Sequence, residues 1–296
     1  MCERDKEFLE RAGAIARKAA IYGKELAREG VALLEIAEKI EEYIIGEGAL
    51  PAFPANLSVN NIAAHYTPPS KACGIDYVLR RGDVLKIDVG AHVNGYIGDT
   101  ALTVEIGTSR WRDLIRCAEE ALNAAISAIK PGISVRTIGK VVETVASSYG
   151  YKPVINLSGH GLGKFIIHTG LTIPNFDNGD NSKLRVGDVI AIEPFVTDGR
   201  GYVENGPCGN IYRITAKRIN SPHLQKIANN FRTLPFAERW CSALFNDHCA
   251  VLKNLERKRA IYCYPTLVEK KGCVVAQAEH TMVIEENGAR ILTSAK

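Results

Sequence analysis

The chain has 296 residues, of which 46% are hydrophobic and 24% are charged. This composition is typical of a globular protein and excludes a disordered, collagenous or coiled-coil chain. The formal net charge of +4 is small for this length and gives no electrostatic reason to expect nucleic-acid binding.

The first segment of the chain is charged and lacks a continuous apolar core, so we expect no secretory signal peptide. No stretch approaches the ~20 uncharged apolar residues of a transmembrane helix, which predicts a protein without a membrane span. The eight cysteines form no CxxC pair, and their spacing fits neither a zinc ribbon nor a dense disulfide framework. We therefore expect free, mostly buried thiols and a cytoplasmic location.

Two amphipathic segments at 4–28 and 31–45 predict a pair of helices, because their apolar residues recur at helical spacing. A second pair of the same kind follows at 111–129 and 133–149. The two pairs share residues at a constant offset: Gly30, Ile36, Glu41, Gly48 and Pro51 match Gly132, Ile138, Glu143, Gly150 and Pro153. This internal repeat predicts a chain built from two duplicated halves.

A strand pattern follows each predicted helix pair, RRGDVLKIDVG at 80–90 and LRVGDVIAIEP at 184–194. Each strand is apolar and closes on a carboxylate, Asp88 in the first half and Glu193 in the second. Two α+β halves are therefore expected, and a site between them would draw side chains from both.

The dipeptide Asn94-Gly95 predicts a tight hairpin, because this pair favours a two-residue turn. Such a turn pairs Asp88 with Ala101 and Gly90 with Asp99, so the two aspartates share one face as diagonal neighbours. Each could be a solvated strand residue when taken alone. Two carboxylates on one buried face repel each other, however, and cations between them remove that repulsion.

The strand equivalent to the one after Asp99 should also begin with a carboxylate, and Glu204 and Glu279 are the two candidates. Glu204 leads into NGPCGN, which is typical of a turn, whereas Glu279 leads into HTMVIE, which copies the pattern after Asp99. We therefore expect Glu279 to be the site residue. On this choice residues 215–262 form a helical insertion subdomain within a single catalytic domain spanning 1–296.

Three histidines accompany the acids. His160 lies in the glycine-rich segment SGHGLG, and His168 and His65 occupy near-equivalent places in the two halves. A single histidine is best interpreted as structural, but this set together with four acids in apolar strands favours metal and proton chemistry. Oxygen-rich ligands with one imidazole suit hard or borderline divalent ions, and their number favours two ions.

The four acids, His160 and His168 lie in six short motifs: IDVG (87–90), GDTA (98–101), GHGLG (159–163), IHTG (167–170), IEPF (192–195) and AEHT (278–281). Taken together, these motifs resemble those of the methionine aminopeptidases. The segments AHYTPP (64–69), LPFAERW (234–240) and YP (264–265) are similar to those of the type 2 enzymes. The resemblance spans nearly the whole chain and is closest to the short archaeal form.

This resemblance implies an α+β fold of the duplicated pita-bread type, with a curved antiparallel sheet, outer helices and a helical insertion. It implies two divalent ions, of Co, Mn, Fe, Zn or Ni, held by Asp88, Asp99, His160, Glu193 and Glu279. It also implies catalytic roles for Glu193, which would accept a proton, and for His65 and His168, which would contact the peptide. Phe53, Ile167 and Tyr264 would contact the methionine side chain.

The implied reaction is removal of the N-terminal methionine of nascent polypeptides, with a preference for a small second residue. A monomer with transient ribosome contact, and without nucleic-acid or membrane partners, is expected. The nearest alternative is a proline-specific aminopeptidase or dipeptidase of the same fold. A non-catalytic ribosome- or RNA-associated binding protein is a more distant alternative that the intact acids disfavour.

Overall fold

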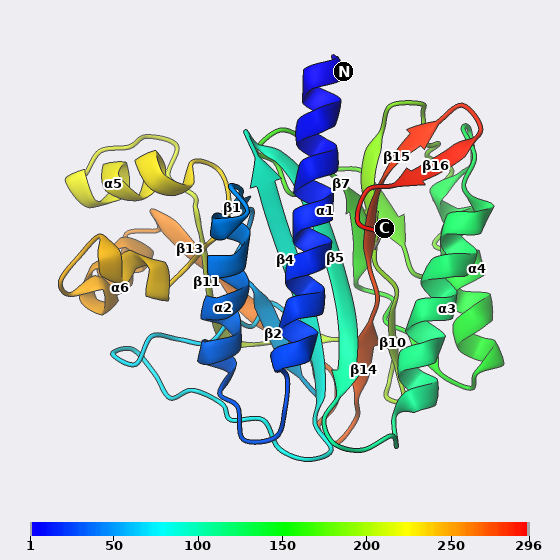
Figure 1. The fold of residues 1–296 in the computed structure, drawn as a ribbon, viewed down its shortest axis with the longest axis horizontal. Coiled ribbons are helices and arrows are strands. Elements are labelled where there is room, and N and C mark those ends of the chain that lie inside the picture. The colour runs from blue at the N-terminus through cyan, green and yellow to red at the C-terminus, as the bar shows by residue number, and fades with distance from the viewer. Residues whose placement is uncertain (1, 295–296) are drawn as a thin grey trace.

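A computed structural model describes residues 2–294 (Figure 1). The helices are α1 (Glu3–Leu26), α2 (Leu33–Gly46), α3 (Arg112–Ala128), α4 (Val135–Ser148), α5 (Pro222–Phe231) and α6 (His248–Arg257), with a 3₁₀ helix η1 (Arg239–Ala243). The four helices predicted from periodicity are confirmed as α1 to α4. Within residues 2–294, no helix combines the length and apolar character needed to cross a bilayer.

The strands form four antiparallel groups. The first joins β1 (Leu50–Pro51), β4 (Val84–Val93) and β2 (Asn56–Val59), with β5 (Tyr96–Glu105) also paired to β4. The second joins β14 (Val275–Gln277), β10 (Phe195–Thr197) and β6 (Lys152–Pro153). The third joins β12 (Phe236–Ala237), β11 (Glu204–Ile214), β13 (Ile261–Val268) and β3 (Ile62–Ala64). The fourth joins β16 (Gly288–Ile291), β15 (His280–Glu285), β9 (Val189–Ile192), β7 (Ser158–Gly161) and β8 (Thr172–Pro174).

The two halves repeat each other in backbone conformation as well as in element order. Gly82 and Gly187 precede β4 and β9 with φ of 89° and 91°, a left-handed conformation that glycine adopts without the steric cost a side chain adds. In Figure 1, α1 and α2 cover the strands of the first half, while α3 and α4 lie beside those of the second. The duplication predicted from the sequence is therefore present in the fold.

Successive side chains of β4 face opposite sides of the sheet, so that one set packs in the core and the other faces away from it. Leu85, Ile87 and Val89 are buried against α1 and α2, so the intervening Asp88 faces the opposite surface of the sheet. Helix α1 approaches this sheet closely at β5, where a Cβ added to Gly98 would lie 2.4 Å from the Cα of Gly13. The helices therefore cover one face of the sheet, and the carboxylate is on the other.

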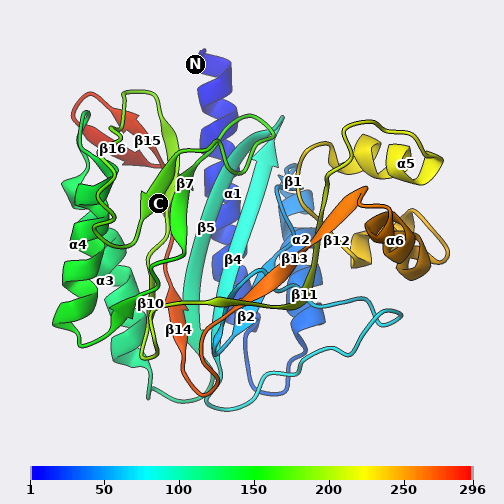
Figure 2. The same ribbon diagram turned by 180° about the vertical axis from the view of Figure 1, so that it is seen from behind.

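Strands β11 and β13 cross the sheet on the side opposite to α1 and α2, as Figure 2 shows. Between these two strands the chain forms α5, β12, η1 and α6, which pack with β11 and β13 around a separate hydrophobic cluster. These helices fall within the predicted range 215–262, although β13 already begins at Ile261. That this range is an insertion into a single catalytic domain stays a prediction.

The prediction that all eight cysteines are free thiols is wrong. The structure pairs Cys73 with Cys249 and Cys208 with Cys263 in disulfides, at sequence separations of 176 and 55 positions. Such separations carry no local spacing signal, so the sequence pattern cannot reveal them. The remaining thiols are Cys2, Cys117, Cys241 and Cys273, of which only the second and third are fully buried.

Candidate metal centre and catalytic cavity

A cavity of about 310 Å³ lies where the two halves and the crossing strands meet. Every predicted site residue lines it: Phe53, His65, Asp88, Asp99, His160, Ile167, His168, Glu193, Tyr264 and Glu279. The rejected alternative, Glu204, lies outside this cavity and forms an exposed ion pair with Arg200. Residues spread over more than two hundred positions of the chain therefore share one concave site.

The β4–β5 hairpin positions the first two acids. Asn94 and Gly95 both have positive φ, of 51° and 88°, as a type I′ turn requires. The resulting register pairs Asp88 with Ala101 and Gly90 with Asp99, which confirms the predicted pairing. The two aspartates consequently project from adjacent strands toward the same side of the sheet.

The second half supplies the other three candidate ligands. His160 lies in β7 opposite Ala191 of β9, Glu193 directly follows β9, and Glu279 lies between β14 and β15.

Hydrogen bonds from backbone and hydroxyl groups join this second half to β5 of the first half. The backbone N–H of Glu279 donates to the Ala101 carbonyl at 3.0 Å. The backbone N–H of Asp99 donates to Thr281 Oγ1 at 2.8 Å, and that hydroxyl donates to the Asp99 carbonyl at 2.7 Å. The halves are thus held together directly beside the acids.

The ligand atoms converge. One atom each from Asp99, His160 and Glu279 lie within 4.8 Å of one another. His160 Nε2 lies 3.7 Å from Asp99 Oδ2 and 3.6 Å from Glu193 Oε1, distances that are too long for hydrogen bonds. Three buried carboxylate oxygens have no hydrogen-bond partner within residues 2–294, namely Asp88 Oδ1, Asp99 Oδ1 and Glu279 Oε1.

The electrostatics of this cluster are unfavourable for a protein without bound cations. Burial raises the pKa of Asp88 to about 7. Burial, and then the charges of the neighbouring acids, raise the pKa values of Asp99, Glu193 and Glu279 well above their ordinary range. Burial also lowers the pKa of His160 to about 3, so its imidazole is neutral and free to act as a ligand at neutral pH.

The residues present fit divalent ions. Within residues 2–294 no lysine or arginine forms an ion pair with any of the four acids, so their charge lacks a compensating group. Carboxylate oxygens without partners and a neutral imidazole are the donors that divalent ions such as Mn²⁺, Fe²⁺ or Co²⁺ take. Cations bound here would satisfy these atoms and remove the repulsion between the acids.

His65 and His168 border the same space. His65 has a φ of 63°, which is uncommon for a residue with a side chain, and its backbone N–H donates to Asn56 Oδ1 at 3.0 Å. Burial lowers its pKa to about 4, and its Nδ1 has no hydrogen-bond partner among the described residues. The exposed His168 packs edge-on against His160, with ring centroids 4.3 Å apart. The left-handed backbone of His65 is rare for a residue with a side chain, and such conformations are often found at functional sites.

Apolar residues form another part of the wall. The ring of Phe53 packs against Gly90, where an added Cβ would lie 2.2 Å from Cε1. Phe53 and Ile167 belong to one hydrophobic cluster, and Tyr264 packs edge-on against His65 with ring centroids 5.3 Å apart. The cavity therefore combines an acidic region with an apolar one.

Sequence reasoning missed two polar residues that serve this site. Gln277 donates from Nε2 to Glu193 Oε2 at 3.2 Å, and its hydrogen bonding opposes the rise in the pKa of Asp88. Strand alternation could have revealed it, because Gln277 is two positions from Glu279. Asn56, which holds His65 and pairs with Asp88 in the sheet, follows no recognisable pattern.

Comparison with protein families gives a match over residues 7–286 to the model described as metallopeptidase family M24. The methionine aminopeptidase of Methanocaldococcus jannaschii is 46% identical over 287 residues, covering 95% of this chain and 96% of the relative. The methionine aminopeptidase of Pyrococcus horikoshii is 43% identical over 297 residues, covering 98% of this chain and 99% of the relative.

Solved structures agree on the fold. The methionine aminopeptidase of Thermotoga maritima is 25% identical and superposes with a TM-score of 0.72, covering 100% of this chain and 98% of that one. A thermophilic Arx1 gives a TM-score of 0.84 at 18% identity, covering 100% and 92% of the two chains. The prolidase of Pyrococcus furiosus gives 0.63 at 23% identity and is covered to 65%. The last two likenesses are evidence for the fold alone.

Proposed function

The chain belongs to metallopeptidase family M24 and to its methionine aminopeptidases, and from this premise we propose how its cavity selects and cleaves a substrate. The protein has the α+β pita-bread fold of that family and removes N-terminal methionine. Divalent metal ions take part in the reaction, as the family implies. The observation that carries the proposal is the meeting of four acids, three histidines and an apolar wall in one cavity.

Two divalent ions are proposed, held by the carboxylates of Asp88, Asp99, Glu193 and Glu279 and by His160. The support is the number of ligands, which exceeds what one ion needs, and the unpartnered oxygens among them. Bound ions would polarise the scissile carbonyl and lower the pKa of water, so that a nucleophile forms at neutral pH. Their identity among Co, Mn, Fe, Zn and Ni depends on availability as well as on ligand type.

Three side chains would transfer protons and contact the peptide. Glu193 would accept the proton of the attacking water and pass it to the leaving amine, a role that its raised pKa supports. His168 would donate a hydrogen bond where negative charge develops on the peptide, and His65 would contact the peptide from the other side. The α-amine of the substrate would lie near Asp88 or Asp99, which would restrict cleavage to the first residue.

Phe53, Ile167 and Tyr264 are proposed to contact the methionine side chain. Their support is the shared apolar cluster around the first two and the place of Tyr264 beside His65. Ile211 and Pro235 line the same cavity from the side of β11 and the helical segment. A wall on this side supports a preference for a small second residue, because a large one would meet it.

The experiment that tests the proposed function is hydrolysis of short peptides by protein supplied with Mn²⁺ or Co²⁺. Met-Ala-Ser is expected to be cleaved, and Leu-Ala-Ser about 10–200-fold less efficiently in kcat/KM, because an apolar pocket discriminates only modestly between similar side chains. Replacing the second residue by phenylalanine should also lower kcat/KM. Substrates of the form Xaa-Pro, with a first residue other than methionine, serve as controls and should not be cleaved.

Two results would contradict the assignment. Cleavage of Xaa-Pro without cleavage of Met-Ala-Ser would move the protein to the proline-specific branch. Absence of turnover with every divalent ion would favour a binding protein of the same fold.

Removing either histidine is predicted to slow catalysis without unfolding the protein. For His168→Ala we expect kcat to fall by ~10²–10³-fold with a smaller change in KM, because the lost donor acts mainly on the transition state. His65→Asn should behave similarly, and asparagine tolerates the left-handed backbone at this position. Steady-state kinetics with Met-Ala-Ser measure both, and His223→Ala, in the exposed part of α5, is the matched control. Unchanged kcat in either site variant would remove that histidine from the mechanism.

A further inference from the structure

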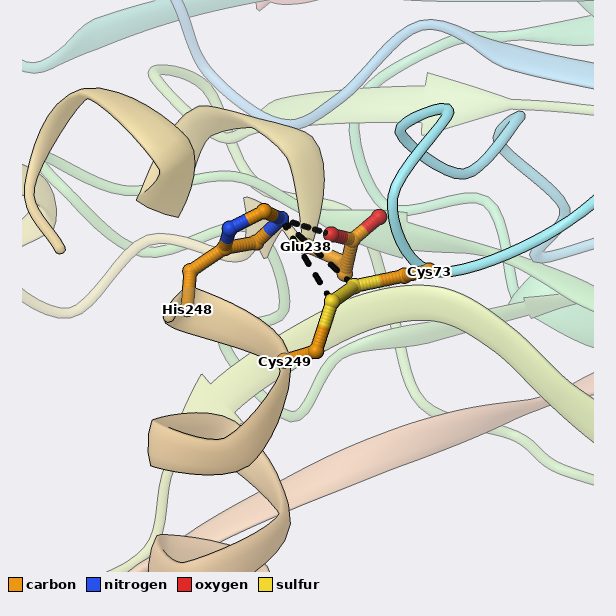
Figure 3. Close-up of side chains that lie close together, drawn as sticks. All are labelled: Cys73, Glu238, His248 and Cys249. Carbon is orange, nitrogen blue, oxygen red and sulfur yellow. Dashed lines mark hydrogen bonds and ion pairs between the residues drawn. A yellow bond between two sulfur atoms is a disulfide. The ribbon is translucent and has the colours of Figure 1, made fainter. Parts of the chain in front are cut away.

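A second cluster of metal-ligand side chains lies outside the catalytic cavity. Cys73, Glu238, His248 and Cys249 each offer one ligand atom, and these atoms lie within 4.8 Å of one another. Figure 3 shows the imidazole of His248 directed toward the two sulfur atoms and toward a carboxylate oxygen of Glu238. None of these residues lines the catalytic cavity, and the reaction proposed above uses none of them.

The cluster joins two parts of the chain that are far apart in sequence. Cys73 lies in the loop between β3 and β4, whereas Glu238 immediately precedes η1 and His248 and Cys249 begin α6. The disulfide between Cys73 and Cys249 is one link across this junction. The site therefore lies between the loop that follows His65 and the helical segment between β11 and β13.

The imidazole of His248 contacts a carboxylate and both sulfur atoms, although a disulfide needs no such neighbours in order to form. Its Nε2 lies 2.5 Å from Glu238 Oε1, 3.5 Å from Cys73 Sγ and 3.8 Å from Cys249 Sγ. Ser70 holds the carboxylate in place, because its backbone N–H donates to Glu238 Oε2 at 2.7 Å and its hydroxyl to Oε1 at 2.8 Å. A hydrogen-bonded carboxylate of this kind is typical of metal ligands, which neighbouring groups orient.

Burial adds to the argument. Glu238 and His248 are 4% and 5% exposed, and taking such groups out of water is costly unless they have partners. The second disulfide offers a comparison. Cys208 and Cys263 join the adjacent strands β11 and β13, and among the described residues no cluster of metal-ligand side chains surrounds them. Convergence of imidazole and carboxylate on sulfur is thus particular to the first disulfide.

We propose that Cys73, Cys249, His248 and Glu238 bind one Zn²⁺ ion when the two cysteines are in the thiol form. Two thiolates, an imidazole and a carboxylate are a complete set for tetrahedral zinc, and such closed sites are structural. Thiolate ligands also separate this site from the oxygen-rich cavity, since soft ligands select zinc. The ion would hold the loop after His65 against η1 and α6.

The dithiol and disulfide forms are related by a balanced exchange. A dithiol reductant gives two electrons and two protons, the Cys73–Cys249 bond breaks, two thiols form, and the reductant becomes a disulfide. Zinc then binds as the two thiol protons leave to solvent. The reductant has access because Cys73 is exposed. The loop is cross-linked in both forms, by a covalent bond in one and by the ion in the other.

Cobalt titration of the reduced full-length protein tests the proposal. Thiolate–cobalt bonds give an ultraviolet charge-transfer absorption that carboxylate–cobalt bonds lack, so the catalytic cavity does not contribute. We expect this absorption in the wild type after treatment with a dithiol, with saturation at one sulfur-bound ion per chain. Reduced protein loaded with Mn²⁺ and one equivalent of Zn²⁺ per chain should show two sulfur neighbours of zinc at about 2.3 Å by X-ray absorption.

Three variants provide the controls. Cys73→Ser with Cys249→Ser should lose the absorption completely, and Cys208→Ser with Cys263→Ser should keep it. His248→Ala should weaken zinc binding by at least ~10-fold, since it removes a ligand rather than an outer-shell partner. Circular dichroism establishes that each variant is folded. A reduced wild type without the absorption, or equal absorption in both cysteine pairs of variants, would overturn the proposal.

Discussion

Replacing Glu279 by glutamine is expected to lower kcat/KM for Met-Ala-Ser by roughly 10³-fold, whereas the same change at Glu204 leaves it unaltered. Glu279 offers a buried, unpartnered oxygen beside Asp99 and His160. A carboxamide of the same shape lacks the charge that holds a divalent ion. Loss of an ion removes several kcal/mol of transition-state stabilisation, and each 1.36 kcal/mol is a tenfold change in rate.

Glu204→Gln is the matched control, because Glu204 is the other candidate that the repeat offers and it is exposed beside Arg200. Metal content measured on the same samples should fall for Glu279→Gln and stay constant for Glu204→Gln. Thermal unfolding of the metal-free variants separates loss of function from loss of fold, and Glu279→Gln should be no less stable than the wild type. Wild-type activity in Glu279→Gln would show that this residue is not a ligand.

The parts of the site that could be predicted depend on local signals. Asn94-Gly95 determines the register of β4 and β5, and that register brings Asp88 and Asp99 to one face. The four long helices follow from 3.6-residue periodicity over windows long enough to be unambiguous. The internal repeat then identifies Glu193 as the equivalent of Asp88. It also favours Glu279 over Glu204 as the equivalent of Asp99, because the segment after Glu279 copies the one after Asp99.

The parts that could not be predicted depend on contacts between distant segments. Asp99 and Thr281 exchange hydrogen bonds across 182 positions, and Cys73 meets Cys249 across 176. No periodicity of either segment encodes its partner, because the approach results from packing of the whole sheet. The crossing strands are similar: β13 carries Tyr264 to the cavity, but neither its pairing with β11 nor its pairing with β3 has a turn signal.

The free energy of unfolding of the metal-free protein is expected to fall as pH rises from about 6.5 to 8. Burial raises the pKa of Asp88 to about 7 and those of Asp99, Glu193 and Glu279 well above their ordinary values. In this window the folded state therefore holds protons that the unfolded state has already released. Each such proton lowers the free energy of unfolding by about 1.4 kcal/mol per pH unit.

Outside this window of about pH 6.5–8, other buried groups titrate and change the pH dependence of the free energy of unfolding. Below the ordinary value of 6.5, buried His65 and His160, whose pKa values are lowered, make stability rise with pH and offset the acids. Above about pH 8, the buried thiols of Cys117 and Cys241, with pKa values raised to about 12, begin to lower stability as well. Between these limits the four acids of the cavity lower stability as pH rises, and buried Lys86, whose pKa burial lowers well below its ordinary value, opposes them.

Divalent ions should reverse the sign of this dependence, because they bind the deprotonated carboxylates in place of protons. At a hundredfold excess over Kd, an ion adds about 2.7 kcal/mol to the folded state, and this addition grows as competing protons leave. Thermal or urea unfolding at pH 6.5, 7.25 and 8, with chelator or with Mn²⁺, measures both slopes. Glu279→Gln should flatten both slopes and Glu204→Gln neither. If Glu279→Gln leaves the slope of the chelated protein unchanged, the four acids do not share the buried cluster that the metal centre requires.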